Sequence, residues 1–419
     1  MRITFILLLI AMTTACKQTA KWEGSLESLL ASQPERFGTV MQNPDKYRVQ
    51  IMYTQINRDA RNQPTFKTFI YNVNPTEYFY PASTVKLPVS VLALEKLRRL
   101  NRPGLNRDTT MLTGSDKDFL TEATTDDTSP DGLPSVAQYI RKILLVSDND
   151  AFNRLYEFVG QREINERLRA MRYFDSRIIH RLESSLSEEQ NRWTNPVKFV
   201  SDDEVIFEQD IAYSDISFRA DQPIPMGVAE MVNGERLERP KDFAAKNAYS
   251  LLDQHEFIRN LVFPDSADPR SRLHLEEDDL RFLYRYMSMY PGESGIDAYT
   301  DAKKYPQGYV KFLMYGGDAK TIPGHIRLFN KVGDAYGFLT DAAYVVDFKN
   351  RIEFILSATI YTNENQTYND DQYEYEEIGL PFLKNLGQAI YEVELDRKRE
   401  YKPDLSRFRF QYGDAQASG

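Results

Sequence analysis

Strand-like segments lie near both ends of the chain, and this distribution is the strongest constraint on its fold. Residues 47–56 and 66–72 alternate apolar and polar side chains, as half-buried strands do. Three β-rich segments follow near the other end, at residues 326–331, 336–348 and 351–362, and Lys349-Asn350 predicts a tight hairpin between the last two. Helical patterns at residues 25–40 and 378–393 flank these segments. We therefore expect one sheet built from both ends of the chain, with a helical lobe formed by the middle residues.

Composition and charge narrow the class of protein. The chain has 419 residues, enough for one large domain or two lobes, and 42% of them are hydrophobic, as in globular proteins. Its formal charge of −10, without a dense basic cluster, argues against a nucleic-acid partner. After the first 16 residues no apolar run is long enough to span a bilayer.

The N-terminus has the pattern of a targeting segment. Arg2 supplies a positive charge, residues 3–11 are apolar, and small residues precede Cys16. This pattern resembles a bacterial lipoprotein signal with Cys16 as the lipidated residue, and a plain secretory signal is the alternative. Cys16 is the only cysteine, which excludes intrachain disulfides and multi-cysteine metal sites. We expect an exported protein of the cell envelope or periplasm that touches the membrane only through its lipid anchor.

A Ser-x-x-Lys motif opens the helical pattern after residue 80. Pro81 suits the start of a helix, so Ser83 falls in the first turn and Lys86 stands three residues later on the same face. A lysine held against a serine in a dry site can lose its charge and take the serine proton. An ordinary amphipathic helix with a solvated lysine explains the motif equally well. The apolar stripe of this helix consists of Leu87, Val91, Leu92 and Leu94.

Two further short motifs carry candidate chemistry. Ser147-Asp148-Asn149 lies between helical patterns, where a loop can present a hydroxyl and an amide to a cleft; its alternative role is a helix N-cap. Lys331-Val332-Gly333 lies in a predicted strand. Its lysine could orient a substrate carboxylate, and Gly333 would let a substrate backbone approach closely. An edge-strand lysine is the plainer explanation of the second motif.

A third segment, Arg181-Leu182-Glu183, lies in a polar stretch that ends at Thr194-Asn195-Pro196. A glutamate held in a loop can act as a general base for water. A solvated surface carboxylate is the alternative.

The order Ser-x-x-Lys, Ser-Asp-Asn, Lys-x-Gly resembles the serine β-lactamase family, class A branch, and the related penicillin-binding proteins. The resemblance covers roughly residues 25–200 and 320–393. It extends to Asn153 after Ser-Asp-Asn, and Arg181 with Glu183 resembles the Ω-loop of the family. The implied fold is α/β (α+β): an antiparallel sheet from both termini, flanked by helices, and an all-helical lobe, with the active site between them.

The resemblance implies a catalytic role for several residues. Ser83 would attack an amide or ester carbonyl, with Lys86, or Glu183 through a water, as the proton acceptor. The N–H groups of Ser83 and Asp334 would form the oxyanion hole, and Ser147 would relay a proton to the leaving nitrogen. Glu183 would then activate the water that releases the acyl-enzyme.

Substrate binding is implied for other residues, and here the sequence departs from the family pattern. Asn149 would orient a side-chain amide of the substrate, and Lys331 would support its carboxylate. Val332 replaces a hydroxyl residue that helps to bind this carboxylate, and Asp334 adds a carboxylate near the same place. Ser187 stands where the family has an asparagine that helps to hold the hydrolytic water.

We therefore expect a serine hydrolase of class A β-lactamase type that cleaves a β-lactam or a related amide or ester. Two alternatives stay open: a D-Ala-D-Ala peptidase or esterase on the same fold, and a penicillin-binding sensor lipoprotein that is acylated without turnover. Glu183 favours turnover, whereas Ser187 weakens that inference. The expected partner is a small-molecule substrate, and the expected state is a monomer.

The predicted organisation is a signal peptide (1–16), a tether (17–24), a hydrolase domain (25–396) with an insertion at about 200–320, and a loose C-terminal tail (397–419). No cofactor or metal is expected, because no phosphate-binding Gly-rich loop occurs and the histidines lack metal-ligand spacing. The histidines are His180, His255, His274 and His325.

Overall fold

The computed structural model describes residues 22, 24–202 and 204–413. The predicted signal peptide, Cys16 and most of the predicted tether lie outside these described residues. Within the described ranges, no helix combines the length and the apolar character needed to cross a membrane.

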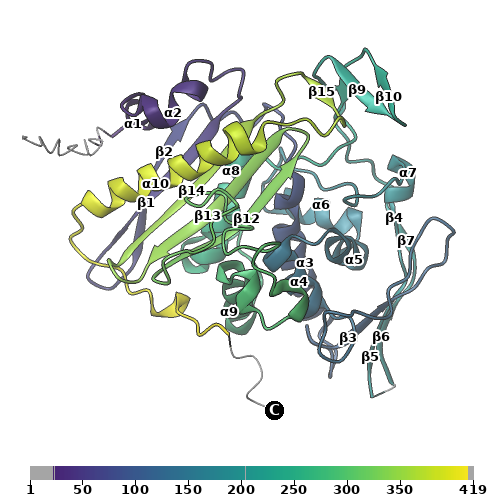
Figure 1. The fold of residues 1–419 in the computed structure, drawn as a ribbon. Coiled ribbons are helices and arrows are strands. Elements are labelled where there is room, and N and C mark those ends of the chain that lie inside the picture. Colours follow the sequence, from purple (N-terminus) through teal and green to yellow (C-terminus); the bar gives the residue numbers. More distant parts are fainter. Residues whose placement is uncertain (1–21, 23, 203, 414–419) are drawn as a thin grey trace, which may run out of the picture.

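A five-stranded antiparallel sheet forms the centre of the molecule, with strand order β12-β13-β14-β1-β2 (Figure 1). Both ends of the chain contribute to it, which confirms the expected single sheet. Lys349 and Asn350 turn the chain between β13 and β14, and both of their N–H groups donate to Asp347 Oδ1. The strands are β1 (Gln50–Arg58), β2 (Pro64–Tyr71), β12 (Ile326–Ala335), β13 (Phe338–Asp347) and β14 (Ile352–Tyr361).

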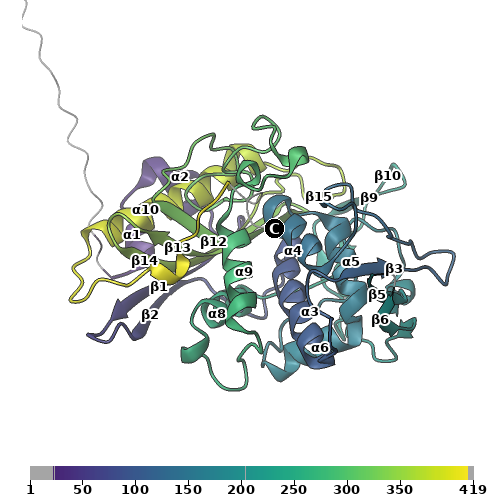
Figure 2. The same cartoon turned by 90° about the horizontal axis from the view of Figure 1, so that it is seen from below.

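Helices cover both faces of this sheet (Figure 2). One face packs against α1 (Leu26–Ala31), α2 (Pro34–Met41) and α10 (Leu380–Asp396), and the other packs against α8 (Leu251–Val262) and α9 (Glu277–Ser288). The single helical pattern expected over residues 25–40 is in fact two helices. Pro34 begins the second one, because a proline disfavours helical geometry in the residue before it.

The second lobe is built mainly from α3 (Lys86–Leu100), α4 (Val136–Val146), α5 (Asn149–Val159) and α6 (Gln161–Ala170). It is not purely helical, because it also carries a three-stranded antiparallel sheet. One of these strands falls in residues 101–134, which we expected to form a loop with short helical pieces. The three strands are β3 (Thr110–Thr113), β5 (Val197–Ser201) and β6 (Glu204–Gln209).

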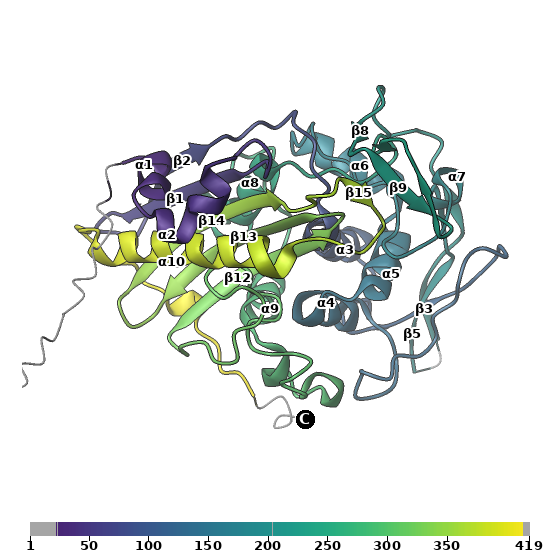
Figure 3. The same cartoon turned by 45° about the horizontal axis from the view of Figure 1, so that its top comes forward.

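Along the chain between β6 and α8, the insertion contributes short strands that pair with one another or with strands outside the insertion. The strands β9 (Ala229–Val232) and β10 (Glu235–Leu237) form a hairpin, and β15 (Thr367–Tyr368) runs parallel to β9 beside it (Figure 3). The other pairs are β4 (Trp193–Thr194) with β7 (Ala212–Tyr213) and β8 (Pro225–Met226) with β11 (Lys241–Asp242). The remaining helical elements are η1 (Ala82–Val85), α7 (Glu188–Asn191), η2 (Pro264–Ser266), η3 (Pro291–Glu293), η4 (Asp297–Tyr299), η5 (Tyr375–Gly379) and η6 (Ser406–Phe408).

The expectation of a loose C-terminal tail is wrong for residues 397–413. Phe408 is buried, and its ring centroid lies 4.9 Å from that of Tyr344 and 5.4 Å from that of Phe329, both on the central sheet. The Arg397 guanidinium donates to Asn57 Oδ1 at 2.6 Å. This segment is rich in charged residues and shows no apolar periodicity, so the sequence does not indicate that Leu405 and Phe408 are buried. Both side chains are buried in the structure.

A buried histidine joins α8 to the sheet. His255 Nε2 lies 2.7 Å from Thr54 Oγ1 of β1, and Nδ1 lies 2.9 Å from Ser357 Oγ of β14. The imidazole has no exposure to solvent, and this burial lowers its pKa from 6.5 to about 3. The neutral ring is thus part of the folded state.

We expect His255→Gln to make the free energy of unfolding less dependent on pH below pH 6.5. Above pH 6.5 the imidazole is neutral in both states, but as the pH falls toward 3 only the unfolded chain takes up this proton. The wild-type free energy of unfolding should therefore fall by about 1.4 kcal/mol per pH unit from this group alone. Urea unfolding of wild type, His255→Gln and the control His274→Gln between about pH 4 and 8 measures the slopes. Equal slopes for wild type and His255→Gln would refute this role.

Candidate active site

The nucleophile candidate Ser83 lies in the short 3₁₀ turn η1, directly before α3. Thr84 Oγ1 donates to Pro81 O at 2.7 Å and closes this turn, while Ala82 has a φ of +47°, which is unusual for a residue with a side chain. Ser83 itself is half-buried. The predicted position at the start of the helix is therefore confirmed, with one tight turn added in front of Lys86.

The strand β12 packs directly against this turn, and Gly333 makes the close approach possible. A Cβ atom built on Gly333 would lie 2.5 Å from Pro81 O and 2.9 Å from Ser83 N. Contacts this short do not occur for real Cβ atoms, so a larger residue would separate the strand from the nucleophile turn. We expected Gly333 to make room for a substrate, whereas in this structure it makes room for the backbone around Ser83.

Lys86 is fully buried and connects Ser83's helix to the Ser-Asp-Asn segment. Its Nζ donates to Asn149 Oδ1 at 2.6 Å, to Ser147 O, and to Ser147 Oγ at 3.4 Å. Ser147 ends α4 with a φ of +59°, and Asp148 caps α5 by accepting from Ala151 N at 2.8 Å. The N-cap explanation of this motif is confirmed, and the cap places Ser147 and Asn149 within hydrogen-bond distance of Lys86.

Lys331 of β12 reaches the same hydroxyl from the opposite side. Its Nζ donates to Ser147 Oγ at 2.8 Å and to Val332 O at 2.9 Å. Ser147 Oγ therefore accepts from two lysines, and its own O–H is left to donate elsewhere. Three motifs that are separated by up to 248 positions in sequence, from Ser83 to Lys331, meet at this point.

Burial weakens the charge of both lysines. Burial lowers the pKa of Lys331 to about 7, although Asp334 and Asp341 raise it. Burial and the neighbouring Lys331 charge together lower the pKa of Lys86 well below its usual value, while Asp148, Asp334 and Glu183 oppose this shift. A lysine with a lowered pKa is able to accept a proton near neutral pH.

A buried polar cluster, which was not predicted from the sequence, lies behind Lys331. Asp341 accepts hydrogen bonds from the backbone N–H groups of Phe312 and Leu313, at 3.1 and 3.0 Å, and from Asn330 Nδ2 at 2.8 Å. Lys311 Nζ donates to Asn330 Oδ1 at 2.7 Å. These bonds fasten the segment around Phe312 to β12 and β13. The one sequence signal was an aspartate, Asp341, in the middle of a mostly apolar strand.

The loop that carries Glu183 is held from two directions. Arg181 is buried, and its guanidinium donates to Glu157 Oε1 at 2.7 Å and to Trp193 O at 3.0 Å. Asn153 and Leu182 exchange two hydrogen bonds, at 3.0 and 2.9 Å, between the amide side chain and the backbone. The backbone that leads into Glu183 is therefore fixed on α5.

Glu183 itself is exposed and has a φ of +46°. Its charge acts on Lys86 and Asp334, raising the pKa of each. Ser187, in contrast, caps α7: its Oγ accepts from Gln190 N at 3.2 Å, and its own N–H donates to Gln190 Oε1 at 2.8 Å. The hydroxyl that replaces the family asparagine is thus engaged in a helix cap.

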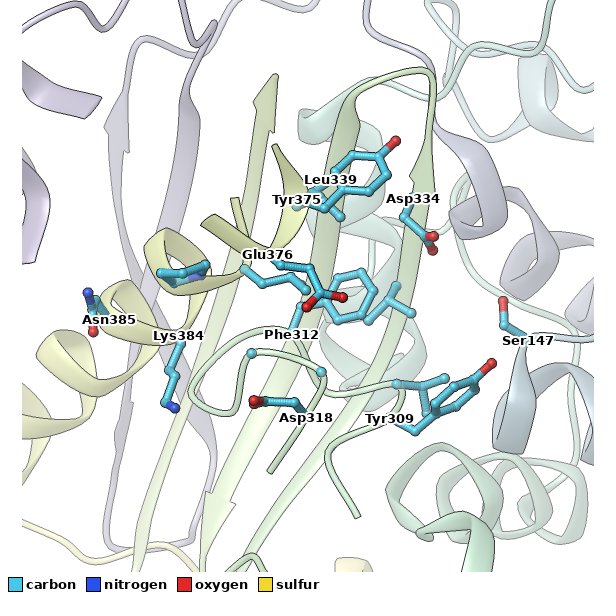
Figure 4. A pocket seen from close by; sticks show the side chains of 16 residues that line it. Ser147, Tyr309, Phe312, Asp318, Asp334, Leu339, Tyr375, Glu376, Lys384 and Asn385 are labelled. Atoms are coloured by element: carbon cyan, nitrogen blue, oxygen red, sulfur yellow. The ribbon is translucent and has the colours of Figure 1, made fainter. Parts of the chain in front are cut away.

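A cavity of about 540 Å³ adjoins these groups (Figure 4). Ser147, Val332 and Asp334 line the end near the lysines, and Tyr309 lies across from them with its hydroxyl toward Ser147. The cavity continues to Lys384 at the start of α10. Asp334 is exposed to this space.

His180 packs against the segment that precedes the nucleophile turn. The His180 ring stacks on Tyr80 with a centroid distance of 6.2 Å, and its Nδ1 lies 2.6 Å from Arg181 O. Burial lowers its pKa to about 3, so the ring is neutral and structural. In the part of the chain that the structure describes, no cluster of three or more His, Cys, Asp or Glu residues is arranged to hold a metal ion.

Residues 35–212 match the model of the beta-lactamase enzyme family, and this match confirms the resemblance found in the sequence. These residues contain Ser83, Lys86, Ser147, Asn149 and Glu183, whereas Lys331, Gly333 and Asp334 join them only through the fold. Over these residues the chain is therefore similar to the beta-lactamase enzyme family.

Several solved structures are similar to this chain at low sequence identity. The structure of PBP-A is 15% identical and has a TM-score of 0.49, with 90% of this chain and 98% of that chain covered. The β-lactamase of Streptomyces albus G is 16% identical, with a TM-score of 0.46 and coverage of 88% and 98%. The β-lactamase of Sphaerobacter thermophilus is 12% identical, with a TM-score of 0.47 and coverage of 88% and 97%. No curated protein sequence matches the chain.

We expect Gly333→Ala to slow acylation of Ser83 by about 10²-fold, because the added methyl group must displace β12 or the nucleophile turn by a fraction of an ångström or more. The rate of labelling by a fluorescent penicillin measures this step. Gly324→Ala is the matched control, since a Cβ atom there meets only open space. Labelling of Gly333→Ala at the wild-type rate would contradict the proposed packing role.

Proposed function

We propose that the protein is a serine hydrolase of class A β-lactamase type, which cleaves a β-lactam or a related amide or ester through an acyl-enzyme on Ser83. The observation that carries this proposal is the convergence of Lys86 and Lys331 on Ser147 Oγ beside the turn of Ser83. Two buried lysines that share one hydroxyl are not expected in a site that only stabilises the fold, because two like charges buried together destabilise the folded state.

In the acylation step, neutral Lys86 accepts the proton of Ser83 as Oγ bonds to the carbonyl carbon. The backbone N–H groups of Ser83 and Asp334 stabilise the resulting oxyanion; the loss of one such donor typically costs about 10²–10³ in turnover. Ser147 donates its proton to the leaving atom as the scissile bond breaks. It regains a proton from Lys86, which had received that of Ser83, while Lys331 holds the hydroxyl in place.

In the deacylation step, Glu183 takes a proton from a water that attacks the acyl-enzyme carbonyl. The hydrogen bonds of Asn153 and Arg181 support this role, because they fix the backbone on the N-terminal side of Glu183. Water then adds to the carbonyl carbon, and Ser83 Oγ leaves with the returned proton.

One observation favours a second candidate, a penicillin-binding sensor that stays acylated. Ser187 is engaged in the cap of α7 and offers no side-chain amide near Glu183 for holding a water. Slow deacylation would follow from a poorly held water. The differences from the family pattern at Val332 and Asp334 affect which substrate can bind. They are compatible with a peptidase or esterase as well as with a β-lactamase.

We expect Ser83→Ala to abolish covalent labelling by a fluorescent penicillin, because Ser83 Oγ is the atom that becomes acylated. Intact-mass spectrometry of wild type and variant after incubation checks this. An adduct of the same mass on Ser83→Ala would place the nucleophile elsewhere and overturn the proposal.

We expect Glu183→Gln to accumulate an acyl-enzyme that the wild type releases, because the variant lacks the base for the deacylating water. A time course of intact mass with a chromogenic cephalosporin, followed alongside its turnover, measures both steps. Glu188→Gln is the matched control, since Glu188 is an exposed carboxylate five residues later, at the start of α7. A wild type that keeps its adduct indefinitely would reject the hydrolase and support the sensor.

A further inference from the structure

The cavity next to Ser147 has an unusual wall. The side chain of Val332 offers no hydrogen-bond donor, and the next residue but one, Asp334, directs a carboxylate toward the cavity (Figure 4). Lys331, which is adjacent in sequence to Val332, donates its hydrogen bonds to Ser147 Oγ and Val332 O. The end of the cavity that adjoins the catalytic groups therefore presents a negative charge and no free positive one among the described residues.

The position of Ser147 tells which part of a substrate enters this cavity. Ser147 passes its proton to the leaving atom in the proposed mechanism, and it also lines the end of the cavity. A group attached to the leaving atom must therefore extend past Ser147, between Asp334 and Tyr309. The acyl part of the substrate stays on Ser83.

Further along, the cavity stays largely anionic but also contains aromatic surface. Asp318 and Glu376 are exposed in its wall, and Lys384 is the one lysine or arginine among its lining residues. Tyr309 and Phe312 supply aromatic rings. Carboxylates and aromatic faces both attract ammonium groups and disfavour carboxylates.

We propose that Asp334 is a specificity-determining residue that selects substrates with a cationic group, such as an ammonium, on the leaving side of the scissile bond and disfavours substrates with a carboxylate there. This inference rests on the proposed acylation of Ser83 and names the class of substrate for that site. It is opposite in sign to the carboxylate binding that the family resemblance implied for Lys331.

The test compares three aryl esters of phenylacetylglycine whose phenol leaving groups carry a meta aminomethyl group, no substituent or a meta carboxylate. We expect the ratio of kcat/KM for the cationic ester to that for the anionic ester to fall about tenfold in Asp334→Asn. The intrinsic reactivities of the esters cancel, because the same ratio is compared between two proteins. The difference should shrink as salt rises from about 10 mM to 1 M, since screening weakens a charge effect but not a steric one.

Two controls separate the possible results. Glu204→Gln removes the same unit of charge from the exposed strand β6 and should leave the ratio at its wild-type value. A ratio that Asp334→Asn leaves unchanged, or a change that salt does not reduce, would overturn the selection by charge while the hydrolase stands. If wild type hydrolyses none of the three esters and Glu183→Gln forms no adduct on Ser83 by intact mass, the proposed function falls and this inference with it.

Discussion

The hydrogen bonds from two buried lysines to one hydroxyl, Ser147 Oγ, are the interaction on which the rest of the site depends. Each buried lysine is destabilising unless its donors are satisfied, and here backbone oxygens, Asn149 and Ser147 accept them. The same burial lowers the pKa of both side chains, so one arrangement satisfies the donors and prepares a base. It also links the lobes, since Lys86 begins α3 and Lys331 lies on β12.

Packing around this centre explains the less obvious features of the fold. Gly333 lets β12 reach the turn of Ser83, and Asp341 binds the segment around Phe312 to the back of that strand. On the other side, Asn153 and Arg181 attach the loop of Glu183 to α5. The proposed catalytic groups are therefore held by rigid elements of both lobes, which favours precise positioning.

Much of the candidate site was predictable because short motifs carry their own geometry. Ser83 and Lys86 lie one turn apart, and Ser147 to Asn149 form a local cap, so their mutual placement follows from local structure. Other features had no local signal. Lys311 was not predicted to lie near the site, the helix cap at Ser187 was not predicted, and Phe408 was expected to lie in a loose tail. In each case a partner distant in sequence, or a competing local bond, decides the role.

The strands at both ends, the motif order and the resemblance to the β-lactamase family follow from the sequence alone. These depend on periodicity and on neighbouring residue types, which are properties of the chain. Only the tertiary structure decided that Gly333 accommodates backbone rather than substrate, that Ser147 Oγ is shared by two lysines, and that Asp334 faces a cavity with no free cation beside it among the described residues. These contacts join residues up to 248 positions apart in the sequence. They cannot be predicted from local patterns, because burial and charge act through space and not along the chain.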